Sequence, residues 1–290
     1  MKGRVLLGIA SALLAIFTYD AVVRLLFSGV VALPSVPGGL RMLTAVLALF
    51  SLVHAWYSLG GRLTIAFFAL SATISWAYEQ VGVTTGLIFG AYHYTDYLGA
   101  KLGDVPLLIP LAWFMMIYPS YVIACLIAGR RPTGTPPGLV PLVRFAAVSA
   151  VVMTVWDLVV DPILSGPDAR AWIWEQGGPY FGIPIQNYLG WLLTTFTVYL
   201  AYRAIEQRAA AAPAGLVTAR VAALAVGAYG AMLAAELLSG VLPSGVLLIG
   251  PVVMGIPIAM ATVRLRPLGT PKAEPPAAGP AKAVTSSDPV

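Results

Sequence analysis

The chain has 290 residues, of which 59% are hydrophobic and only 10% are charged, and its mean hydropathy is +0.86. These values exclude an ordinary soluble domain and indicate a protein whose main solvent is lipid. The formal net charge of +5 does not indicate nucleic-acid binding, because the basic residues are dispersed in short loops, as membrane topology requires. A single cysteine, Cys125, excludes an internal disulfide framework and any cysteine-based metal centre.

Apolar stretches long enough to cross a bilayer recur along the chain, each close to the ~20 residues that a ~30 Å hydrocarbon core requires. The first is expected to be an uncleaved span, because its apolar run continues to Phe27 without a clean small-residue cleavage site. The expected fold class is therefore all-α, a polytopic transmembrane helical bundle of about eight spans within residues 1–266. The spans are expected at residues 5–27, 42–59, 63–80, 105–128, 141–160, 187–205, 216–238 and 245–263.

The remaining residues, 267–290, are rich in Pro and Ala and are expected to form a disordered tail. If the N-terminus is inside, 13 of the 17 basic residues are cytoplasmic, as the positive-inside rule requires of an even number of spans. We therefore expect a multi-pass protein of the cell membrane with both termini, and the tail, in the cytoplasm. Nine of the 12 acids then lie in the outer half.

Two outer connections, residues 81–104 and 161–186, are long, aromatic and Gly-rich, whereas most others are short. Long loops of this kind usually carry function. Each contains a Phe-Gly pair, Phe89-Gly90 and Phe181-Gly182, which is a weak sign of a two-fold internal repeat.

The helix ending in WDLVVDP places Asp157 and Asp161 at i and i+4, on one face, just before Pro162, which is expected to stop the helix. Their mutual repulsion, the negative end of the helix dipole and partial removal from water all favour a protonated carboxyl, as a general acid needs. Ionisable residues in spans are functional candidates by default. The structural alternative is that Asp157 bonds to a neighbouring helix and Asp161 caps the loop.

Three further acidic positions differ in what they predict. Glu79 ends the third span between aromatic residues, so a functional role and an interfacial belt are evenly matched. Asp20 and Arg24 are i, i+4 and oppositely charged, which favours a structural ion pair. Glu236 has no evident sequence partner and is a secondary candidate for the site.

Aromatic residues gather on the same side as the acids, more closely than a membrane belt alone explains. Ring faces attract cations, so acids among rings suit a pocket that protonates an alkene and shelters the resulting cation. The only histidines, His54 and His93, are too few for the histidine clusters of membrane di-iron enzymes, and no nucleotide-binding loop is present. We expect no metal and no cofactor.

Four segments, taken together and in order, resemble the integral-membrane carotenoid biosynthesis family, of the carotenoid 1,2-hydratase and bisanhydrobacterioruberin hydratase type. The resemblance covers mainly residues 75–200. It implies addition of water to the terminal C1=C2 double bond of an acyclic carotenoid end without a redox cofactor. The segments are YEQVGVTTGLIFGAYHY (78–94), IPLAWFMMIYPSY (109–121), WDLVVDP (156–162) and WIWEQGGPYFGIPIQNYLGW (172–191).

On that basis Asp157 and Asp161 are expected to share the acid and water-orienting roles, with Glu79 the next choice for either. The expected partners are a lycopene-like or monocyclic carotenoid substrate, membrane lipid and other carotenoid enzymes. Asn187 is expected to hydrogen-bond the new hydroxyl. The expected substrate-binding residues are Tyr92, His93, Tyr94, Trp113, Trp156, Trp174, Tyr180, Asn187 and Trp191.

Two other classes of protein stay open at this point. A membrane prenyltransferase or carotenoid cyclase also handles isoprenoid cations, but a prenyltransferase needs two Asp-rich clusters for magnesium, and only Asp157 and Asp161 approach one. A lipid or pigment carrier would use intramembrane acids to couple transport to protons. The resemblance favours the enzyme.

Overall fold

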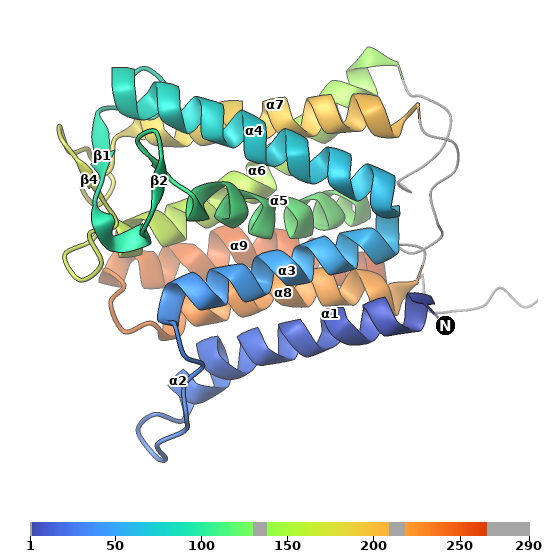
Figure 1. The fold of residues 1–290 in the computed structure, drawn as a ribbon, viewed down its shortest axis with the longest axis horizontal. Helices are drawn as coiled ribbons and strands as arrows, with labels where there is room; N and C mark the ends of the chain where they lie inside the picture. Colours follow the sequence, from blue (N-terminus) through green and yellow to red (C-terminus); the bar gives the residue numbers. More distant parts are fainter. Residues whose placement is uncertain (1, 130–137, 209–217, 266–290) are drawn as a thin grey trace, which may run out of the picture.

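The structure, a computed structural model, describes residues 2–129, 138–208 and 218–265, and the expected tail at 267–290 lies outside the described residues. The described chain forms antiparallel helical rods (Figure 1). The first rod is α1 (Lys2–Thr18), continued by a π-helical turn, η1 (Tyr19–Val23), and by α2 (Arg24–Leu26). The others are α3 (Gly39–Leu59), α4 (Gly61–Thr85), α5 (Leu108–Ile127), α6 (Leu139–Leu164), α7 (Ile185–Glu206), α8 (Ala219–Leu238) and α9 (Ser244–Leu265).

The all-α fold class is confirmed, and the protein is a multi-pass membrane protein by the length and apolar character of its helices. Six rods are long and apolar enough to cross a bilayer. The other two, α4 and α7, have 25 and 22 residues but are more polar. Their polar residues Glu79, Asn187 and Glu206 are buried, so these two helices direct polar groups toward protein rather than lipid.

The described ends, at Lys2 and Leu265, lie at the same end of the bundle (Figure 1). The opposite end, called the strand end below, carries four short strands that the sequence did not predict. β2 (Lys101–Leu102) and β3 (Val105–Pro106) form a hairpin, and a 3-10 turn, η2 (Asp96–Leu98), precedes it. β1 (Tyr92–Tyr94) pairs with β4 (Trp172–Trp174), and this pairing connects the two long loops.

Side chains alternate between the two faces of a strand, and residues directly opposite in an antiparallel pair share a face. The register pairs Tyr92 with Trp174 and Tyr94 with Trp172, so these four rings lie on one face. His93 and Ile173 lie on the other. The small β1–β4 sheet therefore presents an aromatic face toward the helices.

Four prolines lie inside the described helices, Pro119, Pro162, Pro251 and Pro257, and side chains from other segments compensate the first two. Pro162 was predicted to stop its helix, but that prediction is wrong, because α6 continues to Leu164. A proline leaves the carbonyl four residues earlier without its N–H donor. The Tyr180 hydroxyl donates to the freed Leu158 oxygen at 2.8 Å. In α5, Pro119 frees the Met115 oxygen, which accepts from Ser51 at 2.8 Å.

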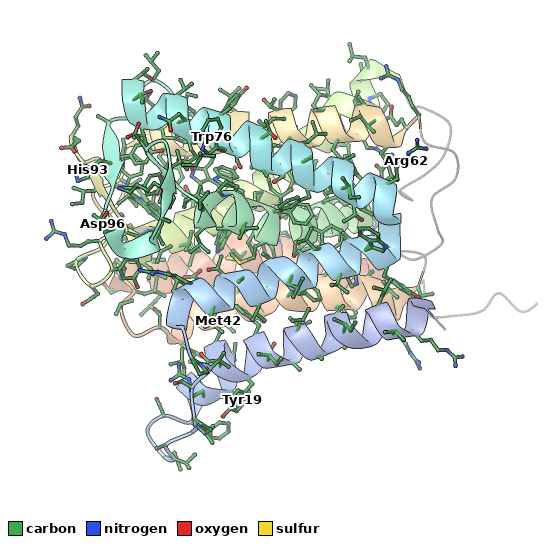
Figure 2. The ribbon with its side chains drawn as sticks, viewed as in Figure 1. Tyr19, Met42, Arg62, Trp76, His93 and Asp96 are labelled. Carbon is green, nitrogen blue, oxygen red and sulfur yellow. The ribbon has the colours of Figure 1, made fainter. Side chains whose placement is uncertain are left out.

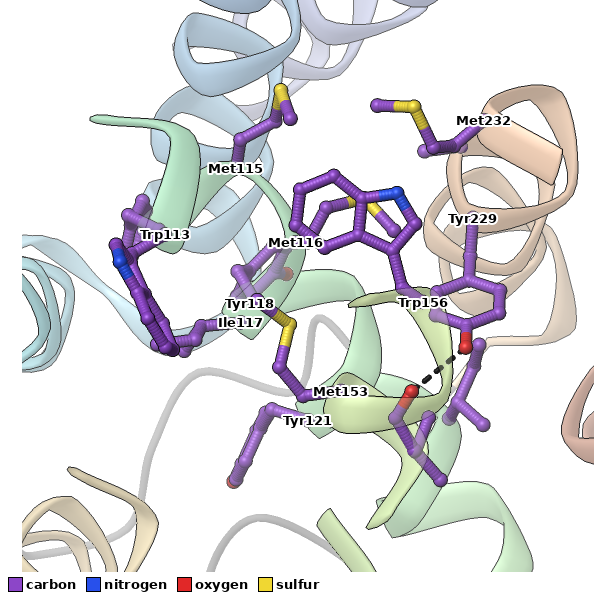
Figure 3. Close-up of a cluster of buried hydrophobic side chains, with 14 of the residues drawn as sticks. Trp113, Met115, Met116, Ile117, Tyr118, Tyr121, Met153, Trp156, Tyr229 and Met232 are labelled. Carbon is purple, nitrogen blue, oxygen red and sulfur yellow. Dashed lines mark hydrogen bonds between the residues drawn. The ribbon is translucent and has the colours of Figure 1, made fainter. Parts of the chain in front are cut away.

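The core is centred on α5, of which 15 of 20 residues are buried, as expected of a helix that is apolar on all sides. Methionines and aromatic rings interdigitate around it, and in Figure 3 the thioether ends of Met115 and Met232 lie on the same side of the Trp156 indole. Deeper in the bundle, Phe67 of α4 stacks on Tyr202 of α7 with ring centroids 3.8 Å apart. These rings hold α4, α5 and α7 together.

Phe89, at the start of the first long loop, is 2% exposed and wedges between α4 and α7. Glycine stands on both helices where the ring contacts them. A Cβ at Gly82 would lie 2.6 Å from Phe89 Cδ2, and one at Gly190 would lie 2.5 Å from Phe89 Cδ1 and 2.6 Å from the Ile88 oxygen. The two glycines thus set the spacing of the helices at the strand end.

Replacing Gly190 by Ala is expected to lower the free energy of unfolding by about 1–3 kcal/mol, because the new methyl overpacks against Phe89 and backbone. Gly227→Ala is the matched control, since its Cβ would meet only Leu14 Cδ2 at 3.9 Å. Thermal unfolding in detergent measures both. Equal unfolding temperatures for the two variants would show that Phe89 does not wedge the helices apart.

Candidate active site

A cavity of about 260 Å³ lies at the strand end, enclosed by α1, η1, α2, α3, α4, α5, α6, α7, α8 and the β1–β4 sheet. Most of its wall is aliphatic or aromatic, and carboxyl groups interrupt it at a few places. This combination of an apolar pocket with a few polar groups is typical of small-molecule sites. The aromatic lining consists of Phe17, Phe89, Tyr92, Tyr94, Trp113, Trp156, Trp172, Trp174 and Trp191.

Glu79 of α4 is 5% exposed and accepts three hydrogen bonds. The phenols of Tyr92 and Tyr94, two residues apart on β1, both donate to Oε2, the second at 2.8 Å. The indole N–H of Trp113 donates to Oε1 at 3.1 Å. These donors come from a strand and from α5, so three separate segments must meet for Glu79 to be buried.

Asp161 of α6 is held in the same manner by β4. The indole N–H groups of Trp172 and Trp174, again two residues apart, donate to Oδ1 at 2.8 and 3.2 Å. Asn187 of α7 donates to Oδ2 at 2.8 Å. The arrangement repeats that of Glu79: a carboxyl near the end of a helix is bound by two alternate aromatic residues of the following strand.

Asp157 is fully buried behind Asp161, outside the cavity lining. The Asn187 amide also donates to Asp157 Oδ2, at 2.7 Å, so one amide group bridges both aspartates. Asp157 Oδ1 has no hydrogen-bond partner among the described residues. Glu79 interacts electrostatically with both aspartates, so the three carboxyl groups form one cluster.

The two phenols on β1 lie outside the helices and act as neutral donors. Burial, and secondly the charge of nearby Glu79, raise the pKa of Tyr92 and Tyr94 well above the ordinary tyrosine value near 10. Both hydroxyls therefore keep their protons and donate them to Glu79 across the physiological range.

Three indoles form a continuous wall of the cavity. Trp113 and Trp191 are stacked, with ring centroids 4.0 Å apart and an angle of 23° between the planes. Trp156 meets Trp191 edge to face, with centroids 5.8 Å apart. At one end of this wall Trp113 donates to Glu79, and at the other Trp156 donates to Glu236 Oε1 at 3.2 Å.

The structure brings together most of the residues predicted for the site. Three lie outside the lining: Asp157 is buried behind Asp161, the Tyr180 hydroxyl donates to the Leu158 oxygen in α6, and His93 points away from the cavity on the outer face of β1 (Figure 2), where it contacts Glu175. His93 is separated from the cavity because it alternates with Tyr92 and Tyr94 on the strand. The predicted residues that line the cavity are Glu79, Tyr92, Tyr94, Trp113, Trp156, Asp161, Trp174, Asn187 and Trp191.

Sequence reasoning missed Trp172 as a site residue, although its spacing of two from Trp174 matches that of Tyr92 and Tyr94. Asp20 also lines the cavity. Its predicted ion pair with Arg24 is present at 3.2 Å. Asp20 lies in η1, and π-helical turns inside α-helices are frequent at functional sites.

The fold and the site define a membrane protein with an apolar cavity lined by buried acids and indole faces. The family model for carotenoid biosynthesis proteins matches residues 38–261, so the chain belongs to the carotenoid biosynthesis protein family, as the four segments indicated. Among curated proteins, a bisanhydrobacterioruberin hydratase from Haloarcula japonica is 36% identical over 129 residues, which are 44% of this chain and 41% of the relative. The match thus spans less than half of that relative. No solved structure is significantly similar.

The raised pKa of the two phenols predicts how stability depends on pH. The folded state keeps these protons above pH 10, where the unfolded chain loses them, so their contribution is complete below about pH 10 and is lost as the pH rises further. The Tyr92→Phe/Tyr94→Phe variant should unfold at a lower temperature than the wild type at about pH 8, and this gap should shrink by about pH 11.

Thermal unfolding in detergent at both pH values measures the gap. Tyr97→Phe, which removes an exposed phenol at the same strand end, controls for the loss of a hydroxyl. A gap that is the same at both pH values would contradict a stabilising role for the buried phenols.

Proposed function

We propose that the protein is a carotenoid hydratase that adds water across the terminal C1=C2 double bond of an acyclic carotenoid end group by acid catalysis, without a cofactor. The observation that carries this proposal is the cavity itself, because carboxyl groups and stacked indoles line the same apolar space. Membership of the carotenoid biosynthesis family and the hydratase named among the relatives support it.

The size of the cavity suits the end of a carotenoid. Pockets that enclose whole drug-sized ligands measure about 300–1,000 Å³. A cavity of about 260 Å³ therefore accommodates a terminal branched unit, while the rest of a long polyene extends beyond it. Aliphatic residues at the rim, among them Leu25, Leu40 and Leu108, suit such a polyene.

The reaction begins with transfer of a proton from a carboxylic acid to C2, which leaves a tertiary cation at C1. Indole faces stabilise cations by about 2 kcal/mol or more when water is excluded. Trp113, Trp156 and Trp191 present such faces along one wall. The oxygen of a water molecule then bonds to C1, and a carboxylate accepts the proton that this water releases, so the product is a tertiary alcohol.

Glu79 and Asp161 are suited to orient that water and accept its proton. Each accepts three hydrogen bonds from neutral donors, which lower the cost of the negative charge that the carboxyl carries while it accepts a proton from water. Asn187 donates both of its amide hydrogens to the two aspartates. Its Oδ1 is then the atom that can accept a hydrogen bond from the new hydroxyl of the product. Asp157, behind Asp161, positions Asn187 and interacts with the charge of Asp161.

The protein is proposed to lie in the cell membrane with the strand end outside. Within the described residues, Arg4, Arg62, Arg144 and Arg220 lie near helix ends opposite the strand end, and Arg62 is seen there in Figure 2. Fewer basic residues occupy the strand end. The positive-inside rule then places both termini in the cytoplasm.

Expression in a bacterium that makes lycopene tests the proposal. The wild-type protein should yield a pigment heavier by one water molecule per end group, detected by mass spectrometry. Asp161→Asn, Asp157→Asn and Glu79→Gln should each reduce product formation by about 10²–10⁴-fold, the usual contribution of acid–base groups.

Asp96→Asn is the matched control, because its side chain is fully exposed at the same strand end, and it should retain the wild-type yield. Membrane fractions probed with an antibody check that every variant inserts. Unchanged lycopene with well-inserted wild-type protein would refute lycopene hydration, and full activity of the three site variants would remove those residues from the mechanism.

A further inference from the structure

Four carboxyl groups line the cavity within the described part of the chain: Asp20, Glu79, Asp161 and Glu236. Asp20 accepts from two nitrogens of Arg24, at 3.2 and 3.3 Å, and from the backbone N–H of Val36 at 2.6 Å. Glu79 and Asp161 each accept three hydrogen bonds as well. Hydrogen-bond donors thus surround three of the four carboxyl groups and offset part of the cost that burial imposes on a carboxylate.

Glu236 is different. It is 8% exposed, and among the described residues it accepts one side-chain hydrogen bond, from the Trp156 indole at 3.2 Å to Oε1. Its second oxygen, Oε2, accepts none, and no described cation pairs with it. A buried carboxylate without such partners is costly, whereas a neutral carboxylic acid needs fewer and has an O–H to donate.

Met232 and Ala235, which precede Glu236 on α8, line the same space with apolar side chains, and Ser239 at the end of the helix also lines it. Figure 3 shows Met232 next to the Trp156 ring, and Glu236 follows Met232 by four positions on α8. In its neutral form Glu236 places a carboxylic acid O–H on the lining of the cavity. It is available to the double bond of a bound ligand.

We propose that Glu236 is the catalytic acid that protonates C2 of the carotenoid end group, opposite the Glu79 and Asp161 wall that handles the water. This role rests on the proposed hydratase function. The Glu236 O–H bond breaks and a C2–H bond forms, with the π electrons of C1=C2 supplying the new bond. The cation at C1 lies against the indoles that run from Glu236 to Glu79, water bonds to C1 from the far side, and its proton passes to Glu79 or Asp161.

If Glu236 is the acid and Glu79 and Asp161 handle the water, hydrogen–deuterium exchange at C2 should distinguish the two roles. In D₂O, Glu236 delivers deuterium to C2. If water capture is impaired, the cation returns a proton from C2 to the Glu236 carboxylate and regenerates the alkene with deuterium in place. Variants of the water-handling residues should therefore label the alkene even though they form little alcohol.

The experiment incubates purified protein in lipid vesicles with lycopene in D₂O and measures both alcohol and deuterium in the recovered lycopene by mass spectrometry. Glu79→Gln and Asp161→Asn should lose about 10²–10⁴-fold of the alcohol yield but still label lycopene. Glu236→Gln should lose both by a similar factor. Glu236→Asp, which keeps a carboxylic acid one methylene further back, should recover part of the labelling.

Binding of lycopene, followed by the shift of its visible absorption, should persist in Glu236→Gln, because an amide replaces the carboxyl at nearly equal volume. Labelling or alcohol formation by Glu236→Gln within tenfold of the wild type would overturn the role of Glu236 and leave the hydratase function standing. Inactivity of Glu236→Asp equal to that of Glu236→Gln would also overturn it. A wild-type protein that binds lycopene but neither hydrates nor labels it would refute the proposed function and the role together.

Discussion

The pairing of β1 with β4 is the constraint on which the site depends, because this small sheet supplies four of the six donors to Glu79 and Asp161. A hydrogen bond to a charged group contributes about 1.5–3 kcal/mol, and a buried carboxylate that loses its donors is strongly destabilising. The two long loops and the ends of α4 and α6 must therefore form together. An isolated strand pair of three residues would not be stable, so the buried carboxyl groups stabilise the sheet as much as the sheet stabilises them.

The same aromatic side chains perform two tasks at once. Their N–H groups donate hydrogen bonds to carboxyl groups that are buried in the bundle, and their ring faces form an apolar wall. Tryptophan combines the two better than phenylalanine would, because its N–H reaches a partner at the edge while the face stays open. Trp113 and Trp156 show this directly, since each binds a different carboxyl group and both contact Trp191.

Hydropathy was sufficient to predict the helical bundle, since ~20-residue apolar runs have few other solutions in a bilayer. The i, i+4 spacing similarly predicted that Asp157 and Asp161 would be neighbours, and Asn187 bridges them.

The strands could not be predicted, because tripeptides such as YHY and WIW carry too little periodicity to identify a strand. The continuation of α6 past Pro162 depends on Tyr180, 18 positions further along the chain, and no local pattern reports such a contact. The two long loops also resemble each other, but not through their Phe-Gly pairs. Each loop carries two aromatic residues, two positions apart, that donate to a buried carboxyl group, Glu79 in one case and Asp161 in the other.

The position of the cavity along the bundle bears on which bond reacts. Its lining residues belong to the strand half of the helices, to the loops at that end and to the β1–β4 sheet, so the site lies toward one end of the spans rather than at their middle. A long apolar polyene in the bilayer brings only its terminal unit to that depth, and water is available there, whereas both are missing at the centre. On the proposed function, the choice of a terminal double bond follows in part from where the acids are placed. The shape of the space between the indole wall and Glu236 then supplies the rest of the selectivity for the terminal double bond. This space must hold C1 against the rings while C2 contacts the acid.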